Sequence, residues 1–404
     1  MRLLLFTGTG GAGTTTVAAA TALHAARRGV KTVLVALGPC APGLDAGVDA
    51  GVDAGSDAGA DVVEREVEPG LAVRPADGAR RAARARAGLA GPLAALAGVL
   101  GVDPLDEREI PGVPLVDEVT ALLEIRDAAA AGADLVVVDV PGPAVAVRLA
   151  ALPAALGRAL ERLLPMERRM LWAMGHGALP GPGASGPPRG FVEAAERLDA
   201  ELADVRQLMT AAGTTARLVI APQDGAPAAA ARARAALALH GVRVDGAVVP
   251  RLVPGDGADP WRAARAAVQA AVLADADTVL APLPVLRGTE RPAGPGTRDD
   301  LAAIGAELYG EALPCALAES RERRWPGVER DGDDFVLVLD LPGARRPEME
   351  LARRGDDLLL DVAGERAAVR LPSGLRRCEV TGAVLRDGAL RVRFRPDPTL
   401  WRTV

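Results

Sequence analysis

The first 37 residues alternate apolar runs with one glycine-rich stretch, and this arrangement constrains the fold more than any other feature of the chain. Residues 2–7 form a continuous apolar run, as expected of a buried parallel strand. A glycine-rich stretch follows at 8–13, and then an alanine-rich, helix-prone segment at 15–28 closes at Gly29. Residues 30–37 form a second apolar run. Strand, loop, helix and strand in this order predict a βαβ unit.

The same alternation continues along the chain. Further apolar runs are interpreted as strands at 133–140, 218–221 and 246–249. Helix-prone segments lie at 80–100, 115–131, 150–175 and 190–212. We therefore predict an α/β body over 1–312, with a parallel sheet flanked by helices and a helical insertion at about 80–130 and 150–212.

The character of the sequence changes near residue 312. Residues 313–332 are charged and irregular, which predicts a linker. From 333 to 404 short apolar segments alternate with turns, and no helical pattern intervenes. This pattern predicts a small all-β sandwich.

The glycine-rich stretch, extended to residue 16, matches a phosphate-binding loop in part. Such a loop has the form G-x-x-x-x-G-K-[ST] between a strand and a helix. Gly8, Gly13 and Thr15 match this pattern, while Thr14 takes the lysine position. The glycines allow backbone N–H groups to surround phosphate oxygens at a helix N-terminus, and Thr15 has a hydroxyl suited to Mg²⁺. The missing lysine charge is one that stabilises the transition state of phosphoryl transfer.

Two other interpretations of this loop stay open. Gly8, Gly10 and Gly13 also spell G-x-G-x-x-G, the dinucleotide fingerprint. That motif needs an acidic residue near the end of the second strand, where this chain has Ala36-Leu37-Gly38, so NAD or FAD binding is disfavoured. A glycine loop that binds nothing is the remaining alternative.

Composition excludes several functional classes. A net charge of −6 offers no basic surface for nucleic acid, and 2% aromatic residues offer few platforms for stacking bases. Cys40, Cys315 and Cys378 form no C-x-x-C pair, so we expect neither a zinc site nor a disulfide framework. No run of strong hydrophobes reaches 18 residues, so we expect a soluble, cytoplasmic protein that is not an integral membrane protein.

Residues 45–61 repeat a four-residue unit with an aspartate at every fourth position. The spacing differs from that of an EF-hand calcium loop. Glycine midway between the aspartates argues against a helix. We interpret this segment as a solvated low-complexity loop.

The N-terminal region resembles the ArsA family, which includes arsenite-pump ATPases and the ATPases that target tail-anchored membrane proteins. The family loop is G-K-G-G-V-G-K-T-T, and it stands here as Gly8-Thr9-Gly10-Gly11-Ala12-Gly13-Thr14-Thr15-Thr16. The VAAATALHAARRGVKTVLV that follows is also similar to the family's next helix and strand. The resemblance covers residues 1 to about 310 and implies a P-loop ATPase with ATP and Mg²⁺ as ligands.

Both family lysines are threonines in this chain. Thr14 replaces the lysine that contacts the phosphates. Thr9 replaces the signature lysine, which in the family reaches the nucleotide of a dimer partner. Gly38-Pro39-Cys40 stands where the family positions the attacking water with an aspartate.

Two later family motifs are kept only in part. In the second switch, residues 139–148 read DVPGPAVAVR; the family histidine is missing, while Asp139, the implied partner of Mg²⁺-bound water, and Arg148 match. The family's V-V-N-R, whose asparagine reads adenine, stands here as VVPR; Arg251 matches, and we count it with residues 8–16 as a nucleotide-binding candidate. The chain has one lysine and no asparagine, a bias that explains neither the lost aspartate nor the use of threonine where arginine is plentiful.

The segment 333–404 resembles the small heat-shock (α-crystallin) domain. The cues are an LPG after the first strand, a GER before a later strand and a TGAV ahead of the last one. Some ArsA-like proteins carry such a domain, which the resemblance implies holds exposed apolar segments. A generic β-sandwich is the alternative.

A methionine stripe suggests a surface for clients. Leu163, Met166, Met170 and Met174 recur at helical spacing, and methionine adapts to varied apolar partners. Targeting members of the family offer an apolar groove to membrane-protein tails, so we offer this stripe as a client groove. A helix buried in the core is the alternative.

These observations favour a degenerate ArsA-like ATPase, weak or inactive, that acts as a client-binding or regulatory protein. We expect a homodimer, or a heterodimer with an active paralogue. A working but atypical ATPase, using arginines from elsewhere in the chain or from a partner, is the enzymatic alternative. A dinucleotide-binding protein is the third.

Overall fold

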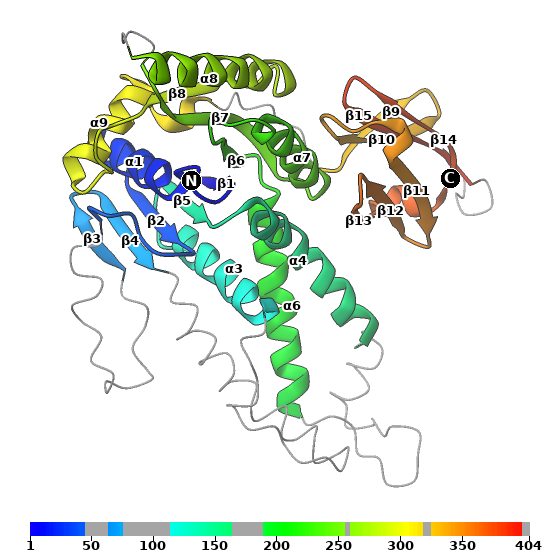
Figure 1. The fold of residues 1–404 in the computed structure, drawn as a ribbon. Coiled ribbons are helices and arrows are strands. Elements are labelled where there is room, and N and C mark those ends of the chain that lie inside the picture. Colours follow the sequence, from blue (N-terminus) through cyan, green and yellow to red (C-terminus); the bar gives the residue numbers. More distant parts are fainter. Residues whose placement is uncertain (45–63, 76–113, 164–188, 255–258, 318–324, 398–404) are drawn as a thin grey trace, which may run out of the picture.

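The computed structural model describes residues 1–44, 64–75, 114–163, 189–254, 259–317 and 325–397. Within them, the N-terminal body is built on one sheet with the strand order β3-β4-β2-β5-β1-β6-β7-β8 (Figure 1). The strands are β1 (Arg2–Gly8), β2 (Thr32–Ala36), β3 (Arg65–Glu68), β4 (Leu71–Pro75), β5 (Leu135–Val140), β6 (Thr214–Val219), β7 (Arg243–Leu252) and β8 (Val285–Thr289). Neighbouring strands run parallel except β3 and β4. The predicted α/β fold is confirmed.

The strands alternate their side chains between two hydrophobic cores. In β1, Leu3 and Leu5 belong to one core, and Leu4 and Phe6 belong to the other. One core includes α1 (Thr14–Arg27) and α9 (Arg298–Tyr309). The other core includes α3 (Pro114–Ala130), α4 (Pro143–Leu163), α6 (Arg189–Met209), α7 (Ala226–Leu239) and α8 (Pro260–Val279). Burial on both faces explains why the strands are continuous apolar runs in the sequence.

The helices α3, α4 and α6 make up the described part of the expected helical insertion. In Figure 1, α4 and α6 lie side by side and extend beyond the sheet, in agreement with their mutual packing. Among the described residues, α4 alone is long and apolar enough to cross a membrane. Core helices pass the same test, and α4 packs on α3, α6 and α7, so we assign it to the body of the fold.

A buried ion pair joins the sheet to α9. Arg217 of β6 is fully buried, and its Nε and Nη2 atoms donate to the two carboxylate oxygens of Asp245 at 3.0 and 2.8 Å. Its Nη1 donates to the Tyr309 hydroxyl at 3.1 Å, and Nη2 also donates to the Pro314 carbonyl oxygen at 3.0 Å. The Tyr309 hydroxyl lies 2.8 Å from the Thr21 hydroxyl of α1. This network ties α1, α9, β6 and β7 together.

The C-terminal part is a two-sheet antiparallel sandwich, as predicted. One sheet has the order β14-β15-β10-β9 and the other β11-β12-β13. The elements are β9 (Gly327–Asp331), β10 (Asp334–Asp340), β11 (Met349–Arg354), β12 (Asp357–Val362), β13 (Glu365–Arg370), α10 (Ser373–Arg376), β14 (Cys378–Arg386) and β15 (Ala389–Pro396). Inward side chains such as Leu339, Leu360 and Phe394 form its core.

The segment expected as a linker, 313–332, contains two ordered elements. A short 3₁₀ helix covers Pro314–Leu317, and β9 (Gly327–Asp331) pairs with β10. The sandwich therefore includes residues before 333. Strand β9 gives little signal in the sequence because it lies at a sheet edge and most of its residues are exposed.

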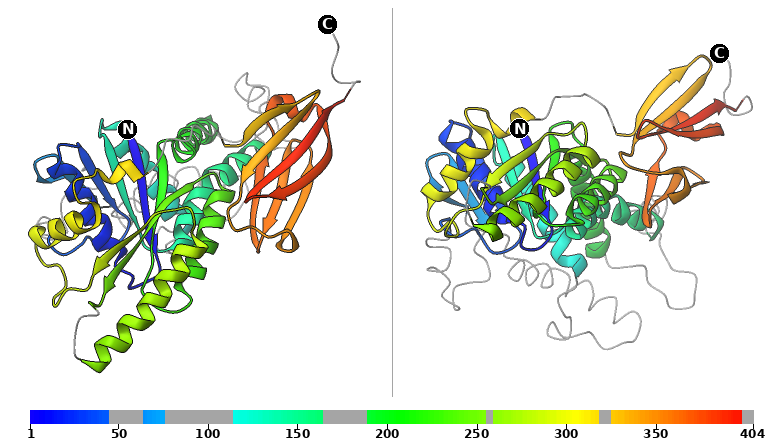
Figure 2. Two further views of the ribbon diagram at one scale, coloured as in Figure 1. Left: turned by 90° about the horizontal axis from the view of Figure 1, so that it is seen from above. Right: turned by 45° about the horizontal axis from the view of Figure 1, so that its top comes forward.

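The sandwich packs against the ends of α4 and α7, as both views in Figure 2 show. Leu239, the last residue of α7, is buried in the core of the sandwich. Arg158 of α4 donates to the Ala368 carbonyl oxygen at 2.9 Å, and Glu161 of α4 pairs with Arg370 of β13. Among the described residues, the two domains are therefore joined by apolar contacts at the end of α7 and by polar contacts from α4.

Candidate functional site

The glycine loop lies at the carboxyl end of β1, and two of its glycines are required by space or by backbone conformation. A Cβ atom on Gly8 would stand 2.2 Å from the Val219 carbonyl oxygen of β6, which no side chain can tolerate. Gly13, directly before α1, has a left-handed backbone with φ 92°. Helix α1 begins at Thr14, so its N-terminal N–H groups open toward the loop.

Several buried polar atoms at the loop lack partners. Thr7 Oγ1, Thr9 Oγ1 and Asp139 Oδ1 are buried without a hydrogen-bond partner among the described residues. A buried polar atom without a partner costs free energy, and such atoms are uncommon in folded proteins. Three of them around one glycine loop indicate a site for a polar ligand.

Asp139 is the fifth residue of the six in β5, and it lies in register with Phe6 of β1 and Ala36 of β2. Burial raises the pKa of its carboxyl group, while a hydrogen bond from Thr15 acts in the opposite direction. A carboxylate beside a threonine hydroxyl is a suitable oxygen set for Mg²⁺, which binds through few protein ligands. Thr15 and Asp139 therefore fit the cation that the family resemblance implies.

The two threonines at lysine positions differ in their surroundings. The Thr14 hydroxyl lies close to Gly8, since a Cβ atom built there would be 2.8 Å from Thr14 Oγ1. Thr9 has its hydroxyl buried, and its carbonyl oxygen accepts from Ala12 N within the loop at 3.0 Å. Neither residue brings a positive charge to the loop.

Arg251 brings a guanidinium to the loop from β7. Its Nη2 atom donates to the Gly11 carbonyl oxygen at 2.6 Å. The backbone of Arg251 is left-handed, with φ 61°, which is unusual for a residue other than glycine. Arg251 therefore lies beside residues 8–16 in this structure, and its nucleotide-binding role stays a prediction.

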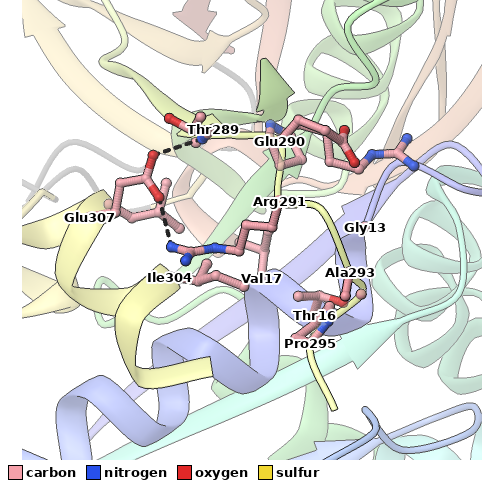
Figure 3. Close-up of a pocket in the computed structure, with 15 residues that line it drawn as sticks. Gly13, Thr16, Val17, Thr289, Glu290, Arg291, Ala293, Pro295, Ile304 and Glu307 are labelled. Atoms are coloured by element: carbon pink, nitrogen blue, oxygen red, sulfur yellow. Dashed lines mark hydrogen bonds and ion pairs between the residues drawn. The ribbon is translucent and has the colours of Figure 1, made fainter. Parts of the chain in front are cut away.

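A cavity of about 100 Å³ opens beside the loop. It is lined by Gly13 of the glycine loop, Thr16 and Val17 from α1, Pro250 and Arg251 from β7, residues 288–291 and 293–295, and Ile304, Glu307 and Leu308 from α9. Figure 3 shows Arg291 extending toward Glu307 across this cavity; Nη2 and Oε2 are 3.0 Å apart. Glu307 Oε1 also accepts from Thr289 N at 2.7 Å. A ligand whose phosphates occupy the loop has room here for its remaining part.

Sequence reasoning missed much of this cavity wall. Residues 288–295 and Glu307 come from a loop and a helix far from the glycine loop in sequence, and no spacing rule connects them to it. The available signal was the segment 285–310, which is similar to the family's closing segment.

Other predicted residues lie apart from the site or outside the described residues. Arg148 of α4 pairs with Glu118 of α3. Leu163 is the last residue of α4, and Met166, Met170 and Met174 lie outside the described residues, as does the aspartate repeat 45–61. Among the described residues, no group of three His, Cys, Asp or Glu side chains is arranged to hold a metal ion.

A parallel sheet with a glycine loop between its central strand and the next helix, and an aspartate at the end of the adjacent strand, defines the P-loop NTPase class. Comparison with known families is more specific. Residues 1–289 match the family described as anion-transporting ATPase (ArsA), and residues 332–394 match the HSP20-like domain found in ArsA. The chain therefore belongs to the ArsA ATPase family and carries its HSP20-like domain.

Similar proteins match along the full length of the chain. An uncharacterized protein of Streptomyces coelicolor is 39% identical, with 99% of each chain covered. The Mycobacterium tuberculosis protein Rv2184c is 32% identical, covering 100% of this chain and 98% of its own. A Chlorobaculum tepidum protein with the provisional name arsenical pump-driving ATPase is 24% identical, covering 98% of this chain and 96% of its own.

Proposed function

We propose that this ArsA-family chain binds ATP with Mg²⁺ at residues 8–16 and hydrolyses it weakly or not at all. Its role is then that of a client-binding or regulatory protein whose state depends on the nucleotide. One observation supports the proposal: a glycine loop leads from β1 through the left-handed Gly13 into α1, as a phosphate-binding loop does, but threonines stand at both of the family's lysine positions.

Binding is supported by groups that do not depend on lysine. The N–H groups at the start of α1 and in the glycine loop can hold phosphate oxygens through the backbone. The unpartnered atoms of Thr7, Thr9 and Asp139 supply further polar contacts at the same place. The adjoining cavity supplies space for the nucleoside.

Thr15 and Asp139 are the residues that hold Mg²⁺ in this proposal. When bound, Mg²⁺ neutralises charge on the β- and γ-phosphate oxygens. A nearby cation favours the ionised form of the Asp139 carboxyl group and so offsets the effect of burial on its pKa. Thr15 fixes that carboxylate by donating a hydrogen bond to it.

Weak hydrolysis is supported by what the site lacks. Loss of one preorganised donor to the transition state typically lowers kcat by about 10²–10³-fold. Here Thr9 and Thr14 remove two cations. Residues 38–40, which follow β2 beside the end of β5, carry no carboxylate to position the attacking water.

The alternative within the family is a working but atypical ATPase, and Arg251 favours it because it supplies a cation from outside the loop. Dinucleotide binding has less support, since β2 ends at Ala36 and no acid follows it directly. Dimer formation, pairing with an active paralogue and a client groove at Leu163–Met174 remain part of the proposal.

Calorimetry with ATP and ADP in Mg²⁺, together with phosphate release, tests the proposal on the unaltered chain and on Thr9→Lys/Thr14→Lys. We expect the unaltered chain to bind nucleotide with little turnover, and the two lysines to raise turnover by about 10²-fold or more. Thr278→Lys is the matched control, because it adds a lysine on an exposed position of α8.

Turnover by the unaltered chain that the lysines do not increase would establish the atypical ATPase instead. Absence of binding by both the unaltered chain and the lysine variant would contradict the whole proposal. Preferential binding of NAD or FAD would favour the dinucleotide alternative.

A further inference from the structure

The end of β7 contains a turn that is stabilised from α8. Arg251 has a left-handed backbone, and a residue other than glycine adopts this conformation at a cost of about 1 kcal/mol or more. Such a conformation persists only where surrounding contacts favour it. Here two of these contacts come from one side chain, Gln269.

Gln269 holds both sides of this turn. Its Oε1 accepts from Val253 N at 2.8 Å, and its Nε2 donates to the Arg251 carbonyl oxygen at 3.1 Å. Gln269 is only 2% exposed, and the other buried residues of α8 are Val272 and Ala276. A buried amide on a helix that is otherwise alanine-rich is costly unless both ends are hydrogen-bonded, as they are here.

The turn aims the Arg251 side chain at the glycine loop. Its Nη2 atom reaches Gly11, two residues before Gly13, while the residue as a whole remains exposed. A guanidinium has five N–H donors, and within the described part of the chain Gly11 is its hydrogen-bond partner. The rest of this guanidinium is available to a ligand at the loop.

Neighbouring arginines are neutralised, in contrast to Arg251. Arg291 pairs with Glu307 at 3.0 Å, and Arg287 of β8 pairs with Asp277 of α8 at 3.0 Å. Among the described ion pairs, none neutralises Arg251, so it contributes net positive charge at the loop.

We propose that Arg251 is the phosphate-contacting cation of this site, in place of the two missing lysines, and that Gln269 is the positioning residue that aims it. The inference rests on the proposed nucleotide binding. A planar guanidinium suits this task because it binds phosphate oxygens in bidentate fashion. The ligand class is a nucleoside di- or triphosphate, recognised through its phosphates.

The test compares ligands that differ in their phosphates. Binding of ADP, pyrophosphate and adenosine is measured by calorimetry for the unaltered chain and for Arg251→Met, which keeps the aliphatic part of the side chain. We expect ADP and pyrophosphate affinity to fall about tenfold or more, and adenosine affinity to stay unchanged. Arg251→Lys should restore part of the loss. Arg287→Met, a paired arginine nearby, is the matched control and should change nothing.

Gln269→Leu tests the positioning role. We expect the ratio of ADP affinity to adenosine affinity to fall in this variant. The double variant Gln269→Leu/Arg251→Met should bind ADP as well as Arg251→Met alone, because Gln269 acts through Arg251. Additive losses in the double variant would show that Gln269 supports only the fold. Melting temperatures of all variants identify any that fail to fold.

The outcomes separate the two proposals. If the unaltered chain binds ADP and Arg251→Met binds it equally well, the assignment of Arg251 is wrong while nucleotide binding stands. An equal loss for ADP and adenosine also overturns the assignment, because phosphate contact is its basis. No binding of ADP or pyrophosphate by the unaltered chain overturns both.

Discussion

At the residue scale, Asp139 combines a buried carboxyl group with a raised pKa, and burial is the main cause. For an acid, a folded-state pKa above the unfolded value means that the folded chain binds more protons in the interval between the two. Stability without a cation therefore decreases as pH rises through that interval and stays lowered above it. At neutral pH the burial of this carboxyl group therefore lowers the stability of the ligand-free protein.

Asp139→Asn should therefore raise the melting temperature of the ligand-free protein at pH 7, because an amide has no ionised form that burial can disfavour. In the unaltered chain, we expect Mg²⁺ with nucleotide to raise the melting temperature, because a ligand stabilises the folded state that binds it. Asp139→Asn should lose this rise, because it removes a ligand of the cation. Thermal melts with and without Mg²⁺-ADP measure both effects. An unchanged Mg²⁺ response in Asp139→Asn would show that the cation is held elsewhere.

The buried pair of Arg217 and Asp245 gives a second residue-scale prediction. Asp245→Ala leaves a fully buried guanidinium without its carboxylate, and we expect the free energy of unfolding to fall by about 3–5 kcal/mol. Asp245→Ala/Arg217→Met should be less destabilised than Asp245→Ala, because no unpaired charge remains. Urea denaturation measures the differences. Asp277→Ala, which breaks an exposed pair, should cost less than about 1 kcal/mol.

The same arginine explains why sequence analysis placed one strand poorly. Arg217 interrupts the apolar run of β6, so the strand was expected at 218–221, whereas the structure has it at Thr214–Val219. By contrast, the strand expected at 133–140 contains the uninterrupted apolar run 135–138 and was located closely, as β5 (Leu135–Val140). A buried charge that is neutralised by a residue 28 positions away, Asp245, is indistinguishable from a surface charge in the sequence.

At the element scale, the junction of β1 with the glycine loop depends on a close approach of two strands. Gly8→Ala places a Cβ atom 2.2 Å from a backbone oxygen of β6, so the loop or the strand pair must shift. We expect a loss of about 1–3 kcal/mol in the free energy of unfolding, with weaker nucleotide binding. Gly10→Ala, with nothing within 4 Å of the added atom, is the matched control for the stability measurement. Equal stability of the two variants would mean that the strands separate at little cost.

The motif elements of the site were predictable, and the elements that complete it were not. The loop and the start of α1 follow from local pattern, because strand, glycine loop and helix are contiguous in the chain, whereas Asp139 was identified through its match to the family's second switch. Arg251 was found through resemblance. Gln269 was not found, since its role depends on a left-handed turn 18 residues away that no pattern in the sequence shows.

At the scale of the whole molecule, one helix connects the candidate site to the HSP20-like domain. α4 begins at Pro143, four residues after Asp139, and its far end contacts the sandwich through Arg158 and Glu161. In the sequence these charges resemble ordinary surface residues, so the domain interface was not predictable. The interface forms because the Ala368 carbonyl oxygen lies opposite Arg158 and the side chain of Arg370 lies opposite Glu161.

His240 lies next to Leu239 at this interface, and we expect its protonation to make the junction sensitive to acid. Burial lowers its pKa to about 4, with the charge of Arg158 as a second cause. Because the folded value lies below the unfolded 6.5, the folded chain binds fewer protons between them. The stability linked to neutral His240 is therefore fully present above pH 6.5 and decreases as pH falls toward 4.

We expect His240→Gln to flatten the loss of melting temperature between pH 6.5 and about 4 relative to the unaltered chain, since glutamine does not titrate in this range. Arg158→Met should produce a smaller change in the same direction, because it removes the second cause of the lowered pKa but leaves His240 buried. Burial also lowers the pKa of His24, which lies on α1 away from the sandwich. His24→Gln is therefore the control that distinguishes a histidine in the body of the fold from His240 at the interface. Melting curves of the full chain across this pH range, with limited proteolysis to report release of the sandwich, measure the effect. Equal slopes for the unaltered chain and His240→Gln would show that the domain junction does not respond to this histidine.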